Sequence, residues 1–447
     1  MSVSIKDNSP GRIQAKAVLH PIIIIGALFF IYGFVTWLNS ILIPYFKIAC
    51  ELKSDAQSFL VATAFFIAYT VMAIPSSYVL KKTGYKKGMS LGLLIMAAGA
   101  LLFVPAAQSR SYDMFLVGLF VIGTGLALLQ TASNPYVSMI GPIESAASRI
   151  SIMGICNKTA GIIASLIFGY IALKDTDQMV ATLQTKTEAE KNVILNELAA
   201  RVINPYIIIA AVLIVFTALI YFSSLPDIKE EEKDSAQASK LSAGKSSIFQ
   251  FPHLLFGVLA IFLYVGVEVM AGDTIISYGR SLGIEMSKAK FFTSATLACM
   301  LIGYIIGIFT IPKYISQQNA LKYCAMLGVL FTGAALLTSG YTSVLFIALL
   351  GLANSLMWPA IFPLAINGLG KFIKIGSALL IMGIAGGAIL PLIYGAMMES
   401  SIQHSIAKGV AEGAAKAKAA QQSYWIMIPC YLFIGYYAVS GYKLRKK

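Results

Sequence analysis

The chain has 447 residues, of which 58% are hydrophobic and only 12% are charged, and its mean hydropathy is +0.78. Soluble globular proteins carry about 25% charged residues, so this composition excludes a chain whose whole surface faces water and favours one that lipid covers. The net charge of +14 does not predict nucleic acid as a partner, because excess lysine and arginine in a membrane protein marks cytoplasmic loops.

The N-terminal residues 1–18 are polar and mildly basic, and an apolar run follows from Leu19 to Phe46. This run is too long to be the core of a cleaved signal peptide. We therefore interpret it as the first transmembrane span.

Twelve segments of the chain contain the roughly 20 mostly apolar residues that a spanning helix needs. An all-α membrane protein with twelve transmembrane helices is therefore predicted. In chain order the predicted spans are 19–46, 57–80, 88–107, 113–140, 150–173, 204–224, 252–281, 289–312, 320–338, 342–369, 374–397 and 422–442.

Residues 225–251 separate six predicted spans from the other six. This stretch is charged, rich in serine and short of apolar residues, which is typical of a linker and not of a domain. The predicted organisation is an N-terminal bundle over 1–224, a linker over 225–251 and a C-terminal bundle over 252–447.

An internal repeat relates the two bundles. Gly-Leu-Ala at 125–127 is followed by Ile-Met-Gly-Ile at 152–155, and the same pair of sequences recurs at 351–353 and 381–384. Two six-helix halves that repeat in parallel are how one large transporter fold is built, with its substrate at the midplane between them. The repeat therefore predicts pseudo-symmetric bundles around a central site.

By these span bounds only two acidic residues lie deep in apolar segments, Glu268 and Asp273 in the seventh span. A charge near the bilayer centre is costly, so it should face the bundle interior or a water-filled cavity. Five positions on a helix correspond to about 140° of rotation, so the two acids share one face only if the helix breaks, which Gly266 and Gly272 permit. The functional interpretation is cation coupling, first at Glu268 and then at Asp273; the alternative is a structural pair with Lys158 of the fifth span.

Amide and indole side chains recur in the same spans. Gln130 and Asn134 lie four residues apart, as do Asn354 and Trp358, so each pair is predicted to share a helix face. Amides both donate to and accept from sugar hydroxyls, and indole rings offer flat apolar surfaces, although amides also join helices structurally. The predicted substrate-binding residues are Asn39, Trp37, Gln130, Asn134, Asn157, Asp273, Asn354 and Trp358.

Other kinds of site receive no support from the sequence. The five cysteines form no Cys-x-x-Cys pair, the three histidines are scattered, and no metal site is predicted. The glycine-rich run at 383–390 lacks the strand and the lysine of a nucleotide-binding loop. No catalytic set is readable, so the chain is not expected to be an enzyme.

Several longer stretches show a family resemblance: FFIYGFVTWLNSILIPYFK (29–47), LLQTASNPYVSMIGP (128–142), SRISIMGICNKTAG (148–161), GVEVMAGDTIISYG (266–279), LANSLMWPAIFPLAINGLGK (352–371) and GSALLIMGIAGGAILPLIYG (376–395). Together they resemble the glucose/galactose permease group in the fucose-permease branch of the major facilitator superfamily. The resemblance covers both halves of the chain.

This resemblance implies the major facilitator fold and a sugar permease of a bacterial inner membrane that works by alternating access. Fucose permeases carry proton-linked acids where this chain has Ser40 and Gln130. Because those two residues are neutral, a coupling carboxylate must lie elsewhere in this chain.

We therefore expect a secondary active transporter, a symporter for a monosaccharide such as glucose or galactose. No cofactor is expected beyond a coupling sodium ion or proton, and a monomer in the lipid bilayer is expected. The alternatives left open are a proton-coupled fucose or N-acetylglucosamine permease, a uniporter, a passive channel, and a membrane sugar sensor that does not transport.

The topology can be tested with reporter fusions. Four lysines lie in the short loop KKTGYKKG (81–88), and the tail YKLRKK is basic as well, so the positive-inside rule predicts that both termini and the linker are cytoplasmic. Fusions at Ser235 and Lys447 should both report from the cytoplasm. A periplasmic signal at either position would contradict the six-plus-six arrangement.

Overall fold

The computed structural model describes residues 10–139, 145–223 and 246–446, and across these ranges every regular element is a helix. In lipid the backbone must satisfy its own hydrogen bonds, and helices do so within each segment. The predicted linker lies outside the described residues except for 246–251, where Ser247 caps the short helix η2 (Ile248–Gln250).

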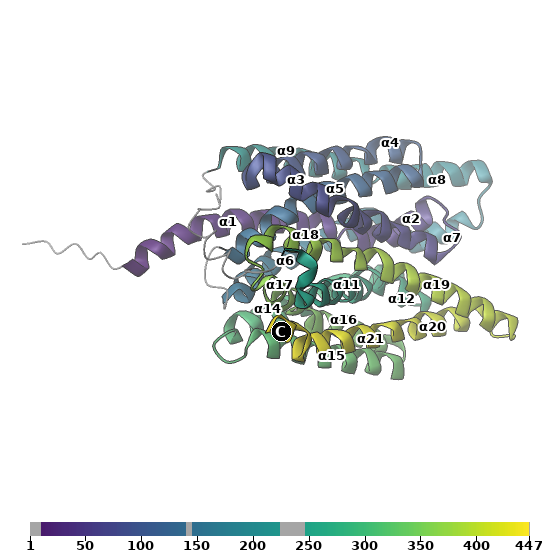
Figure 1. Ribbon diagram of the computed structural model, residues 1–447. Coiled ribbons are helices and arrows are strands. Elements are labelled where there is room, and N and C mark those ends of the chain that lie inside the picture. Colours follow the sequence, from purple (N-terminus) through teal and green to yellow (C-terminus); the bar gives the residue numbers. More distant parts are fainter. Residues whose placement is uncertain (1–9, 140–144, 224–245, 447) are drawn as a thin grey trace, which may run out of the picture.

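The first half of the chain forms the layer drawn in purple to teal in Figure 1. Serine and threonine caps start two of its helices: Ser54 accepts from the backbone of Gln57, and Thr187 forms a capping box with Glu190. Its helices are α1 (Pro10–Thr36), α2 (Asn39–Ala49), α3 (Asp55–Leu101), α4 (Phe103–Gln108), α5 (Tyr112–Met139), α6 (Ala146–Ala172), α7 (Thr176–Leu183), α8 (Glu188–Ala200) and α9 (Ile203–Phe222).

The second half forms the green to yellow layer of Figure 1. Its α-helices are α11 (Pro252–Asp273), α12 (Ile275–Ser281), α13 (Met286–Ala289), α14 (Phe292–Thr310), α15 (Gln317–Leu337), α16 (Gly340–Asn354), α17 (Met357–Ile366), α18 (Ile373–Met382), α19 (Gly386–Ala407), α20 (Glu412–Ser423) and α21 (Met427–Val439). Short 3-10 turns complete it: η3 (Gly370–Phe372), η4 (Gly383–Ala385), η5 (Tyr424–Ile426) and η6 (Gly441–Lys446).

Twelve membrane crossings follow from these helices. Within the described ranges, ten helical segments are long and apolar enough to span a bilayer. One of them, Asp55–Gln108, has 54 residues and turns back at Gly84, whose φ is +75°, so it crosses twice. The helix α21 follows α20 through η5 and supplies the last crossing. The predicted all-α fold with twelve spans is therefore confirmed.

Four spans are interrupted within their length. The first breaks between α1 and α2, the seventh between α11 and α12, the tenth between α16 and α17, and the eleventh at η4. The tenth has a clear cause: Pro359 has no N–H to offer the carbonyl of Ser355, so the helix is interrupted before it. The seventh breaks only after Asp273, so α11 is continuous between Glu268 and Asp273, and the break that Gly266 and Gly272 would permit does not occur there.

The halves meet along two equivalent seams. In one seam the fifth span packs on the eighth, where Gly154 lies against the ring of Tyr304. In the other the eleventh packs on the second, where Gly387 lies against the ring of Phe66. Exchanging the halves converts one seam into the other, as the pseudo-symmetry predicted from the repeat requires.

A polar contact joins the halves outside the spans as well. Asp177 of α7 accepts hydrogen bonds from Arg280 at 2.9 Å and from the backbone N–H groups of Met286 and Ser287 at 3.2 and 3.1 Å. This contact ties the loop after the fifth span to the loop before the eighth.

Candidate functional site

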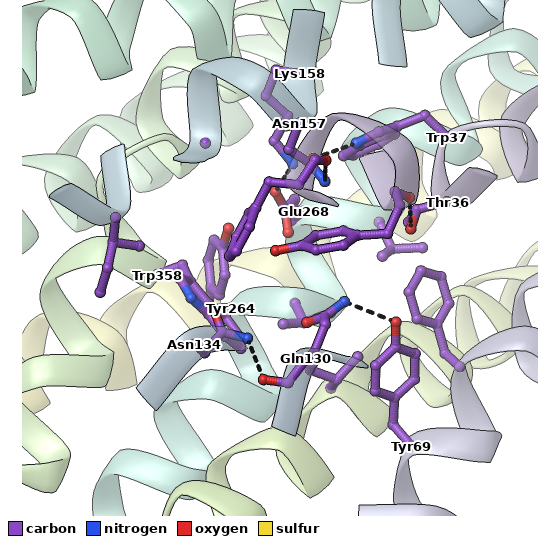
Figure 2. A pocket seen from close by; sticks show the side chains of 18 of the residues that line it. Thr36, Trp37, Tyr69, Gln130, Asn134, Asn157, Lys158, Tyr264, Glu268 and Trp358 are labelled. Carbon is purple, nitrogen blue, oxygen red and sulfur yellow. Dashed lines mark hydrogen bonds and ion pairs between the residues drawn. The ribbon is translucent and has the colours of Figure 1, made fainter. Parts of the chain in front are cut away.

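A cavity with about 770 Å³ of unfilled space lies between the two halves. Side chains from eight spans border it, and the helix interruptions of the first and tenth spans lie beside it (Figure 2). Its lining residues are Phe29, Tyr32, Thr36, Trp37, Phe66, Tyr69, Gln130, Asn134, Ile150, Gly154, Asn157, Lys158, Tyr264, Val265, Glu268, Val269, Asp273, Tyr304, Trp358 and Ile384.

A buried ion pair crosses this cavity. The Nζ atom of Lys158, on α6 of the first half, lies 2.8 Å from Oε1 of Glu268, on α11 of the second half. The two side chains are only 8% and 10% exposed. Opposite charges attract strongly where water is largely excluded, but removing either partner leaves a buried charge without compensation. The pair therefore links the halves through their interior.

Trp37 is clamped beside this pair. Its Nε1 donates to Oδ1 of Asn157 at 3.1 Å, and the Lys158 ammonium lies 4.2 Å from the centre of its ring. Gly161 and Gly272 contact the same indole from opposite halves: a Cβ added at either position would lie 2.5 Å from a ring atom. Only glycine at these two positions allows the bulky ring to lie between the halves.

The amides of α5 form a second polar group. The Gln130 side-chain amide donates to the Tyr69 hydroxyl at 2.9 Å. The Asn134 side-chain amide donates to the backbone carbonyl oxygen of Gln130 at 3.1 Å. Figure 2 shows both bonds at the border of the cavity. The two amides therefore share one helix face, as the spacing predicted.

The second half contributes an aromatic wall. Trp358 of α17 is stacked with Phe362 at 5.7 Å between ring centres and lies 6.4 Å from Tyr264. Together with Trp37 it places an indole from each half at the cavity.

Asp273 differs from Glu268 in its surroundings. It is 2% exposed and borders the cavity, and among the described residues its Oδ1 has no hydrogen-bond partner. Both acids reach the same cavity although α11 is continuous between them. An acid with an unsatisfied buried oxygen needs a proton, a cation or a ligand hydroxyl.

Two predicted site residues lie away from the cavity. Asn39, at the first position of α2, is fully buried, and neither of its amide atoms has a partner within the described part of the chain. Asn354 is fully buried too and accepts a hydrogen bond from Tyr431 at 2.9 Å. The break before Pro359 removes the helix face that Asn354 was predicted to share with Trp358, so the pairing of these two is wrong.

Sequence reasoning missed the phenol side chains of the cavity. Tyr32, Tyr69, Tyr264 and Tyr304 all border it. Tyr264 precedes Glu268 by four positions, which places both on one face of α11; that spacing was the available signal.

The chain is similar to known membrane transporters. A family model described as Major Facilitator Superfamily matches residues 25–414. A Brucella abortus protein named glucose/galactose transporter is 31% identical, and the match covers 99% of this chain and all of that protein. The L-fucose-proton symporter of Escherichia coli is 29% identical over 87% of this chain and 89% of its own length.

The fold agrees with these similarities. A crystal structure of the Escherichia coli fucose:proton symporter superposes with a TM-score of 0.70 and 28% identity, covering 94% of this chain and 98% of that one. A crystal structure of a bacterial homologue of the lysosomal transporter Spinster, in an inward-facing conformation, has a TM-score of 0.61 at 16% identity and supports the fold alone.

The placement of Asn354 can be tested by stability measurements. Asn354→Ala leaves the buried Tyr431 hydroxyl without an acceptor, so the variant should lose about 1–3 kcal/mol of unfolding free energy. Tyr431→Phe removes the other partner, and the double variant should lose less than the sum of the two. Thermal unfolding in detergent measures all three, and strictly additive losses would contradict the contact.

Proposed function

This chain belongs to the Major Facilitator Superfamily, and we propose that it carries a monosaccharide of the glucose or galactose type through the membrane by alternating access. It is a multi-pass membrane transporter and not an enzyme. The observation that carries the proposal is a central cavity bordered by amides of the first half and by one indole from each half.

Sugar recognition is assigned to groups that already border this cavity. Gln130, Asn134 and Asn157 supply amide donors and acceptors from the first half, and Trp37 and Trp358 supply flat surfaces for the C–H faces of a sugar ring. Because ligand contacts come from both halves, a bound sugar favours their closure around it.

Cation coupling is assigned to one of the two buried acids. Ser40, which stands where fucose permeases carry an acid, donates its hydroxyl to the backbone carbonyl oxygen of Trp37 at 2.8 Å. Its hydroxyl is therefore bonded to the neighbouring backbone. With all groups ionised, Glu268, Asp273 and Lys158 leave the cavity with one negative charge, which one proton or one sodium ion neutralises. Since Glu268 has Lys158 as its partner, Asp273 is the acid beside which we place the coupling cation.

The alternative functions differ in the sugar that is transported, in the coupling ion, or in whether the protein transports a sugar at all. The similarity to fucose-proton symporters favours, as the second candidate, a proton-coupled permease for fucose or N-acetylglucosamine; a uniporter is the version without a coupling ion. Uptake of labelled sugars into proteoliposomes, under imposed sodium or proton gradients, separates these from one another and from a sensor that moves no sugar.

The cellular setting is part of the proposal. The named relatives are bacterial, which supports the cytoplasmic (inner) membrane, and the lysine clusters support cytoplasmic termini. We further propose that a monomer surrounded by lipid transports the sugar, since each chain encloses its own cavity.

Sugar binding provides the first test of this assignment. Gln130→Ala and Asn134→Ala should each lower sugar affinity by about 5- to 150-fold, because each leaves sugar hydroxyls unpaired in a partly dry cavity. Calorimetry on purified protein measures the change, and Gln422→Ala, at an exposed position of α20, is the control. Unchanged affinity in both cavity variants would exclude this face of α5 from the sugar site.

Coupling provides the second test. Asp273→Asn keeps the shape of the side chain and removes its charge, so gradient-driven accumulation should be lost while downhill uptake and sugar exchange persist. The control is Asp113→Asn, the same change at an exposed acid in the first turn of α5. Full accumulation by folded Asp273→Asn protein would remove Asp273 from coupling.

A further inference from the structure

One lysine side chain in this cavity makes two contacts at once. The ammonium group of Lys158 lies both against the Glu268 carboxylate, at 2.8 Å, and over the Trp37 ring, at 4.2 Å. The carboxylate and the ring face are the kinds of group that would otherwise meet a sugar hydroxyl and a sugar C–H face. Lys158 therefore occupies contacts that a bound sugar would need.

The pair also joins the two bodies that must move. Lys158 belongs to the first half and Glu268 to the second, and their side chains are almost fully withdrawn from solvent. A lone buried charge at either position would be strongly unfavourable. Without Lys158, a closed and empty cavity would enclose two uncompensated carboxylates, on Glu268 and Asp273; with it, only one remains.

We propose that Lys158 is a positioning residue for the return of the empty carrier: it takes the place of the sugar and neutralises Glu268 while the empty cavity closes. This inference rests on the proposed transport function. When sugar enters, Lys158 leaves the Trp37 face, and the loaded cavity closes around the sugar instead. Lys158 therefore matters for the empty step of the cycle and little for the loaded step.

Net uptake and exchange separate the two steps. Net uptake into sugar-free vesicles requires the empty carrier to return, whereas exchange between sugar-loaded compartments cycles only loaded carriers. Lys158→Met should lower net downhill uptake of labelled glucose or galactose at least about tenfold, because Glu268 becomes a lone buried charge in the closed empty state. Exchange should stay within about threefold of the unaltered protein.

A double variant tests whether charge compensation is the cause. Glu268→Gln alone leaves Lys158 without its partner and should also slow net uptake selectively. Lys158→Met combined with Glu268→Gln replaces the pair by two neutral side chains of similar length, so the ratio of net uptake to exchange should recover to within about threefold of that of the unaltered protein. This double variant also has no lone charge that prevents folding, so it decides the question if either single variant fails to fold.

Lys418→Met, at an exposed position on α20, is the control for the loss of a lysine. Parallel loss of net uptake and exchange in Lys158→Met, with a raised KM for exchange, would overturn the inference and make Lys158 a direct sugar ligand. A folded double variant whose net uptake stays about tenfold low relative to its own exchange would overturn the inference too. If the unaltered protein exchanges no sugar of a labelled panel, the proposed transport function itself fails. If it exchanges sugar but Lys158→Met loses both activities in parallel, or the double variant does not recover, only the role of Lys158 fails.

Discussion

The central interaction of this protein is the buried ion pair between Lys158 and Glu268. It joins the two halves in the middle of the membrane, where neither charge could remain alone. Because its partners belong to separate halves, the pair can break and re-form without unfolding either half. An interaction that is strong only while both partners meet suits a carrier whose halves must come together and separate in every cycle.

The interrupted helices explain why these polar groups can gather at one depth. The breaks in the first, seventh, tenth and eleventh spans lie near the cavity, and irregular backbone within a membrane is tolerated where protein or a cavity surrounds it. Trp37 lies at the first of these breaks and is packed between Gly161 and Gly272. The same ring thereby contacts α6, α11 and the Lys158 ammonium.

The inter-half contacts fall into two kinds. The seams of the fifth with the eighth span and of the second with the eleventh are closely packed and mainly apolar, with one hydrogen bond from the Thr63 hydroxyl to the Ala388 carbonyl oxygen at 2.9 Å across the latter. Asp177 and the Lys158–Glu268 pair are instead charged contacts. A charged contact is lost once its partners move apart, and each partner must then be compensated elsewhere. The charged contacts therefore stabilise the arrangement of the halves seen in this structure.

The sequence by itself determined the membrane class, the twelve spans and the two-half organisation, because apolar runs of spanning length and an internal repeat are local, one-dimensional signals. It also identified Gln130, Asn134, Asn157 and the two deep acids, since polar residues are rare enough in lipid to stand out. Only the tertiary structure decided which of them meet. It paired Glu268 with Lys158 and left Asp273 without a partner for Oδ1 in the described part of the chain. It also turned Asn354 toward Tyr431. Helix breaks and the distances between separate spans depend on packing between residues far apart in the sequence, 77 positions for Asn354 and Tyr431 and 110 for Lys158 and Glu268, which periodicity along one helix does not encode.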